Sequence, residues 1–147
     1  MRSGGIGWAS ALSLARLGCS IAVHYLSPAE KATELVSQLQ ALPGVKAAAF
    51  QADLSAYDNV RKLHREVVAT LGHPDILFNN SGSTGRMIGP QGEIESLSVE
   101  EFEDIWRLNT GSSFLVCDIC SISLLELILK ALMAVVDATM PPQYGRQ

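Results

Sequence analysis

Two spacings of apolar residues alternate along most of the chain. Apolar residues at helical spacing predict four helices, over residues 8–17, 29–41, 55–71 and 98–109. Short apolar runs between these helices predict three strands, over residues 21–25, 46–51 and 75–79. Helices that alternate with strands are typical of a doubly wound parallel sheet, so the pattern predicts the α/β class.

Cap and turn residues mark the ends of the predicted elements. Gly18 follows the first helix at the position where a left-handed residue ends a helix. The segment Ser27–Glu30 supplies an N-cap, a proline for the first helical position and a capping-box glutamate. Ser55 and Ser98 are expected to cap the next two helices in the same way. A glycine-rich loop is expected over residues 80–92.

A longer apolar stretch runs from Phe114 to Val136 and carries Asp118, Glu126 and Lys130 as charges. Each charge at the centre of a bilayer costs about 2.5 to 3.5 kcal/mol, which argues against a membrane span. Glu126 and Lys130 are also paired at i and i+4 on one polar stripe. We therefore expect a buried or dimer-facing helix, which offers an interface for a homo-oligomer, and no membrane contact.

The composition is that of one globular domain. The 147 residues are 48% hydrophobic and 18% charged, which excludes a disordered chain. The net charge of −4 provides no basic surface for nucleic acid. Three cysteines are too few for a disulfide framework, which favours a reducing compartment, with the cytoplasm as the expectation.

The cysteines and histidines suggest no metal or nucleophile site. Cys117 and Cys120 form a CxxC without a second pair of ligands, so no metal is expected. His24, His64 and His73 are scattered over a strand, a helix and a turn. None pairs recognisably with a serine or cysteine, so no general base is assigned.

Three polar or glycine-rich segments are candidates for binding chemistry. Gly4-Gly5-Ile6-Gly7 stands before the first helix, where free amides and the helix dipole attract a phosphate, although a turn or packing role explains it equally well. Asp53 follows a strand, and its carboxylate can accept hydrogen bonds from a ligand or form an Asx turn. Asn80 and Gly82 follow the next strand, where Gly82 leaves room for a ligand or forms a plain turn.

Four motifs in this order resemble those of the short-chain dehydrogenases/reductases. Residues 2–7 resemble the end of the TGxxxGIG loop, and Asp53-Leu54 matches the aspartate after the third strand. Residues 79–82 look like the NNAG motif. Asn109, which is unfavourable in a helix unless its amide is used, matches the helix asparagine of the catalytic tetrad.

The resemblance covers roughly residues 1–117 and implies a partial NAD(P)-binding Rossmann domain there, followed by a divergent C-terminal helix and tail over residues 118–147. It implies an NAD(P)-dependent oxidoreductase that transfers hydride between a cofactor and a small carbonyl or alcohol substrate. Asn109 is the catalytic residue it implies, because the family's asparagine helps hold a water beside the catalytic lysine. The cofactor-binding residues it implies are Gly5, Ile6, Gly7, Ser27, Asp53, Leu54, Asn80, Ser81 and Gly82.

The residues after the second strand of the family fold bear on the choice of cofactor. An acidic residue there would bind the ribose 2′-hydroxyl and repel a 2′-phosphate. The segment His24–Ser27 has no carboxylate, which favours NADP(H) and still allows NAD(H). Arg2 and Ser27 are the expected phosphate contacts.

Two departures from the family pattern limit the resemblance. The first strand and the opening Thr-Gly of the glycine loop should precede Arg2, so the expected Rossmann-like sheet is incomplete, with a central gap. The YxxxK motif is absent from the printed sequence, and the only tyrosine after Asn109 is Tyr144. Without this proton donor, hydride transfer should slow by several orders of magnitude.

Three interpretations remain open. The chain is a truncated or mis-spliced form of an oxidoreductase, missing the first strand and the catalytic C-terminal half. Alternatively, it is a non-catalytic dinucleotide-binding module that retains Gly5, Gly7, Asp53 and Asn80. A third interpretation is an interaction protein that docks a partner through the apolar face of residues 114–136.

Overall fold

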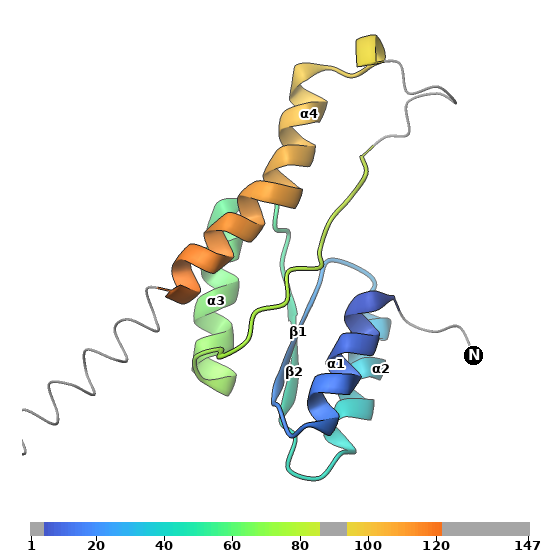
Figure 1. The fold of residues 1–147 in the computed structure, drawn as a ribbon, viewed down its shortest axis with the longest axis vertical. Helices are drawn as coiled ribbons and strands as arrows, with labels where there is room; N and C mark the ends of the chain where they lie inside the picture. Colours follow the sequence, from blue (N-terminus) through green and yellow to red (C-terminus); the bar gives the residue numbers. More distant parts are fainter. Residues whose placement is uncertain (1–4, 86–93, 122–147) are drawn as a thin grey trace, which may run out of the picture.

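A two-stranded parallel sheet is the centre of the fold. The computed structural model describes residues 5–85 and 94–121 (Figure 1). Strands β1 (Ile21–Tyr25) and β2 (Ala47–Gln51) pair along all five of their residues. Both strands lie where the apolar pattern predicts them, and the predicted α/β class with a parallel sheet is confirmed.

Helices cover both faces of this sheet. Helices α1 (Ile6–Arg16) and α2 (Ala29–Gln40) lie side by side on one face, and α3 (Tyr57–Leu71) lies on the other (Figure 1). Gly18 ends the first of these as predicted: at φ +90° its N–H donates to the Ala15 carbonyl. The three helices therefore confirm the helical spacing read from the sequence.

The last described helix is longer than predicted. Ser98 caps α4 (Val99–Trp106) in a full capping box with Glu101, as expected. The prediction that this helix ends at Asn109 is wrong, because the chain passes through a π-helical turn, Arg107–Gly111, and continues as helix over residues 112–121. A short 3₁₀ turn, Ile94–Ser96, precedes α4.

Two of the predicted caps are wrong. The N-cap of α2 is Pro28 and that of α3 is Ala56, and neither helix has a side-chain cap hydrogen bond. The Ser55 hydroxyl instead donates to the Asp53 carboxylate across 2.7 Å. The hydrogen bond to Asp53 therefore fixes the Ser55 hydroxyl beside the carboxylate, and no N–H of α3 donates to it.

Two apolar clusters form the core, one on each face of the sheet. The cluster between the sheet and its first two helices is the larger, and Leu39 is its most buried residue. The other cluster lies under α3, centred on Ala52, Leu54 and Val60, and Leu108 and Leu115 of the last helix pack against it. The last helix is thereby fixed to the sheet through α3.

The predicted strand over residues 75–79 is wrong. These residues form a bend at Asp75 followed by irregular backbone, and within the described part of the chain the sheet has only β1 and β2. Ile76 and Phe78 are 60% and 52% exposed. An apolar run forms a strand only when a neighbouring strand accepts its backbone hydrogen bonds, and this run has no such neighbour there.

The expected helix over residues 114–136 is described only up to residue 121, which is helical. Its remainder lies outside the described residues. Within the described ranges, no helix is long and apolar enough to cross a bilayer.

Candidate functional site

Glycine and polar residues from three segments meet at the carboxyl edge of the sheet. A cavity of about 930 Å³ opens there, and five predicted site residues line it: Gly5, Gly7, Ser27, Asn80 and Ser81. We call these five residues the mouth of the cavity. Parallel strands place their carboxyl ends together, and open α/β sheets bind ligands at that edge.

The start of α1 is shaped for an anion. Gly5 is the N-cap, no side chain caps the helix, and its first turn carries no acidic residue. A Cβ atom added to Gly7 would lie 3.0 Å from Nδ2 of Asn80. The free N–H groups at the start of α1 and the Asn80 side chain therefore lie close together. They can do so because Gly7 has no side chain to fill the space between them.

His24 ties β1 to the loop that follows residues 75–79. Its Nε2 lies 2.9 Å from the Ala52 carbonyl oxygen, and its Nδ1 lies 3.2 Å from Oγ of Ser81. Because a carbonyl only accepts, Nε2 carries a proton and donates it to Ala52, while Nδ1 shares a hydrogen bond with the Ser81 hydroxyl. The His24–Ser81 hydrogen bond positions a loop, and the sequence did not reveal it because 57 residues separate the two.

Asp53 lies on the same edge but lines a separate cavity of about 250 Å³. Its Oδ1 accepts from the Ser55 hydroxyl at 2.7 Å and the Ser55 N–H at 2.9 Å. The hydroxyl bond, followed by the backbone bond, lowers the pKa of Asp53 below 3.8. The carboxylate forms the Asx turn that was its alternative interpretation, and its Oδ2 accepts no hydrogen bond from the described residues.

Leu54 and Ile6 differ in how they can reach a ligand. The Leu54 side chain is buried in the core cluster under α3, so only its backbone could contact a ligand. Ile6 is 71% exposed at the first position of α1. Arg2, an expected phosphate contact, lies outside the described residues.

The Asn109 amide holds the loop after Asn80. Its Nδ2 donates to the Ser83 carbonyl and its Oδ1 accepts from the Ser83 N–H, both at 2.8 Å. A Cβ atom on Gly82 would lie 3.0 Å from Oδ1 of Asn109. The unfavourable helical asparagine therefore uses its amide, as expected, and fastens residues 82–83 to the π-helical turn.

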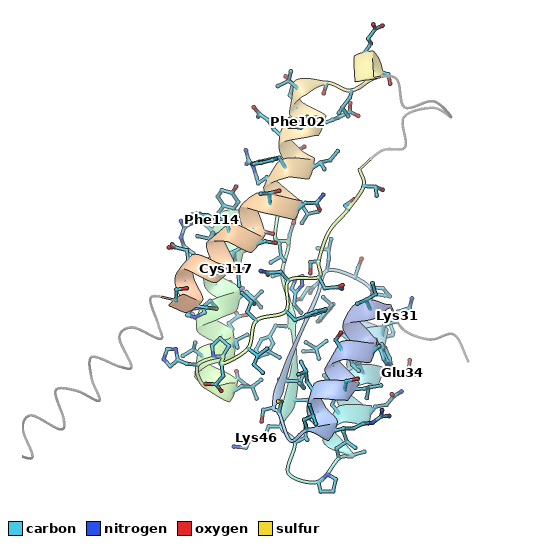
Figure 2. All side chains as sticks on the ribbon, viewed as in Figure 1. Lys31, Glu34, Lys46, Phe102, Phe114 and Cys117 are labelled. Carbon is cyan, nitrogen blue, oxygen red and sulfur yellow. The ribbon has the colours of Figure 1, made fainter. Side chains whose placement is uncertain are left out.

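Lys31 is a residue that the sequence analysis missed. It lies in the first turn of α2 and lines the same cavity as Ser27. Figure 2 shows Lys31 and Lys46 at opposite ends of the sheet. The signal for Lys31 was its position four residues after Ser27, at the start of a predicted helix. Across the described residues, no group of three or more potential metal ligands comes together.

Comparison with known proteins identifies the family. The family model for short chain dehydrogenase matches residues 2–127. The chain belongs to the short-chain dehydrogenases. The resemblance drawn from the four motifs is thereby confirmed.

Curated relatives are fungal proteins. Hydroxynaphthalene reductase arp2 of Aspergillus fumigatus is 39% identical over 112 residues, which are 76% of this chain and 39% of that protein. The short chain dehydrogenase/reductase nsrJ of Aspergillus novofumigatus is 38% identical over 76% of this chain and 40% of its own. The chain thus spans about two fifths of the length of these relatives.

Solved structures show the same fold. A short chain dehydrogenase from Burkholderia cenocepacia in complex with NADP has a TM-score of 0.71 and 31% identity, over 80% of this chain and 45% of its own. A blue fluorescent protein from a metagenomic library in complex with NADPH has a TM-score of 0.65 and 30% identity, over 81% of this chain and 46% of its own. Both support the Rossmann-like fold.

The substitution Ser55→Ala tests the cause of the lowered Asp53 pKa. It removes the hydroxyl donor and keeps the backbone N–H, so we expect the pKa to rise toward 3.8. Because the folded pKa lies below the unfolded one, ionised Asp53 stabilises the fold at neutral pH, and this contribution is lost as the pH falls through the folded pKa. Carbon-detected NMR titration of the carboxyl group measures the change.

Ser37→Ala is the matched control. The Ser37 hydroxyl donates to the Thr33 carbonyl within α2, away from Asp53. This variant should leave the Asp53 titration unchanged. An Asp53 carboxyl that titrates at the same pH with and without the Ser55 hydroxyl would contradict the assignment.

Proposed function

We propose that these residues form the dinucleotide-binding part of an oxidoreductase that transfers hydride between NADP(H) and a small carbonyl or alcohol substrate. The observation that carries the proposal is the uncapped start of α1, where Gly7 stands so close to Asn80 that a Cβ would lie 3.0 Å from its amide. Membership of the short-chain dehydrogenases and the NADP and NADPH bound to its structural neighbours support the same function.

The residues at this edge fit a nicotinamide dinucleotide. The backbone of Gly5, Ile6 and Gly7 would hold the pyrophosphate, because free helix amides and the dipole attract an anion. Ionised Asp53 has an oxygen left to accept from the adenine amine. Asn80, Ser81 and Gly82 would line the ribose, with backbone contacts from Leu54. When bound, the nicotinamide ring supplies or accepts the hydride.

Asn109 would act as a positioning residue. Its two hydrogen bonds to Ser83 hold the loop that carries Gly82 against the helix. Loss of this side chain would release the loop that would face the ribose. The catalytic role that the family resemblance implies for Asn109 would depend on this anchoring.

Catalysis by the printed residues alone would be slow. Reduction of a carbonyl needs a proton donor beside the reacting oxygen. The printed sequence holds no tyrosine followed four residues later by lysine. We therefore propose that cofactor binding and catalytic turnover are separable here, with binding as the property of these residues.

The homo-oligomer remains a second proposal. The interface would be the apolar helix that begins at residue 114, which is described over residues 114–121. Phe114, its first residue, is 72% exposed. Val99, Phe102 and Trp106 are exposed at helical spacing along the preceding turns, so the apolar surface extends back along α4 (Figure 2). A second copy of the chain is the expected partner.

Gly7→Val tests the space beside Gly7 at the start of α1. A branched side chain would fill the space beside Asn80 and block the approach of a phosphate, so we expect the Kd for NADPH to rise at least about tenfold, the effect of losing one charged hydrogen bond. Quenching or enhancement of NADPH fluorescence measures the Kd. Wild-type protein that shows no saturation at millimolar NADPH would overturn the proposed function.

Ala9→Val is the matched control for this variant. Ala9 lies in the same turn of α1 but is exposed and does not line the cavity. It adds the same β-branched side chain and costs the helix more than Gly7→Val does, because alanine is a better helix former than glycine. An equal rise of the Kd for NADPH in the two variants would show that helix stability, rather than the space beside Gly7, controls binding.

Lys31→Glu tests the preference for NADP(H). Lys31 lines the cavity beside Ser27, where it could pair with a 2′-phosphate. We expect the ratio of NADPH to NADH affinity to fall about tenfold or more. Lys46→Glu is the control, because it makes the same charge change at the opposite end of the sheet (Figure 2). An unchanged ratio of NADPH to NADH affinity in Lys31→Glu would show that Lys31 does not contact the 2′-phosphate.

A further inference from the structure

Tyr57 contacts both ends of the π-helical turn that carries Asn109. Tyr57 is the first residue of α3, and the last helix passes beside it (Figure 1). The Tyr57 hydroxyl lies so close to Gly111 that a Cβ atom there would overlap it. The guanidinium carbon of Arg107 lies 5.9 Å from the centre of the Tyr57 ring, within the range of a cation–π interaction. One aromatic side chain therefore meets the first and the last residue of the turn.

The close approach of Tyr57 depends on the glycine at position 111. The turn Arg107–Gly111 is π-helical, and the Ser112 N–H donates to the Arg107 carbonyl across it. In helical backbone an alanine is ordinarily more favourable than a glycine. Contact with Tyr57, rather than the backbone conformation, therefore accounts for the glycine here. Such π-helical turns within α-helices frequently lie at functional sites.

The residues in the middle of the turn face the core and the loop after Asn80. Leu108 packs against the apolar cluster under α3. The Asn109 amide donates to the Ser83 carbonyl and accepts from the Ser83 N–H, both at 2.8 Å. Hydrogen bonds weaken steeply as their angle departs from linear, so both bonds need the amide at a fixed place and orientation. A shift of the turn relative to α3 would weaken both bonds together.

Tyr57 is also close in sequence to the other end of the candidate site. Asp53 precedes it by four residues, and the Ser55 hydroxyl and N–H hold the Asp53 carboxylate. At the other end, Gly82 approaches Asn109 so closely that an added Cβ would lie 3.0 Å from Oδ1. The contact between Tyr57 and the turn therefore joins the segment of Asp53 to the loop of Gly82.

We propose that Tyr57 is a positioning residue of the cofactor site. It fixes the turn Arg107–Gly111 against the start of α3, and the turn in its place holds the Asn109 amide on the loop. The distance between Asp53 and Gly82, which would contact the adenine and the ribose of one ligand, is set in this way. The effect on NADPH binding rests on the proposed function, whereas the effect on Asn109 does not.

The first test measures hydrogen exchange of the Asn109 side-chain amide in the full chain without cofactor. Tyr57→Ala removes both contacts with the turn, so exchange should become at least about tenfold faster, the effect of losing one hydrogen bond. Tyr57→Phe keeps the ring that Arg107 faces and should retain most of the protection. The Gln40 side-chain amide, which donates to the Ala47 carbonyl at 2.9 Å, is the internal control and should not change.

The second test is Gly111→Ala. Its methyl group would overlap the Tyr57 hydroxyl, so Asn109 exchange should become at least about tenfold faster and the Kd for NADPH should rise by a similar factor. In a double variant with Tyr57→Phe, the methyl group would meet only Cζ at 3.0 Å and Cε1 at 3.2 Å, so most of the loss should be recovered. Phe114→Ala is the matched control, because it removes a ring that is 72% exposed on the same helix.

Three results would overturn the proposal. They are an equal loss from Gly111→Ala with and without the Tyr57 hydroxyl, unchanged Asn109 exchange in Tyr57→Ala, and exchange that becomes equally faster at Asn109 and Gln40. If Gly111→Ala does not fold, the two Tyr57 variants decide the outcome by themselves. Because the exchange measurement needs no cofactor, a wild-type chain that fails to bind NADPH would overturn the proposed function alone.

Discussion

The parallel pairing of β1 with β2 is the interaction on which the rest of the structure depends. It places the ends of both strands, Tyr25 and Gln51, at one edge of the sheet. Helix α1 runs back antiparallel to β1, so it begins at that edge, and its amide end meets Asn80 there. An antiparallel pairing would divide the same polar residues between the two ends of the sheet. The candidate cofactor site is therefore a consequence of strand direction.

The large cavity beside β1 is the second constraint on the site. The mouth of the large cavity carries the glycines and amides of the dinucleotide site, while the space behind it is lined by β1 and residues 75–78. Gly7 and Asn80 therefore meet at one end of a space that also runs along β1.

Local signals in the sequence predicted most of the helices and strands. The features that the sequence did not predict depend on contacts between residues that are far apart in the chain. The end of α1 and the start of α4 followed from Gly18 and Ser98, whose partners lie within five residues. The predicted caps at Ser27 and Ser55 were wrong because capping depends on where the folded backbone places the hydroxyl, and the Ser55 hydroxyl lies against Asp53. Residues 75–79 failed as a strand because pairing needs a neighbour. In the site, the glycines and Asn80 were identified from motifs, whereas His24 with Ser81 was not, since 57 residues separate them.

The central claim is that residues brought together at the carboxyl edge bind a nicotinamide dinucleotide. NMR chemical-shift mapping of the ¹⁵N-labelled chain with NADPH tests it most directly. The account predicts that the largest amide shifts occur at Gly5, Gly7, Asp53 and Asn80, while Gly18 and Gly44, which precede β1 and β2 at the opposite edge, stay still. Shifts concentrated at that opposite edge or along α4 would contradict it.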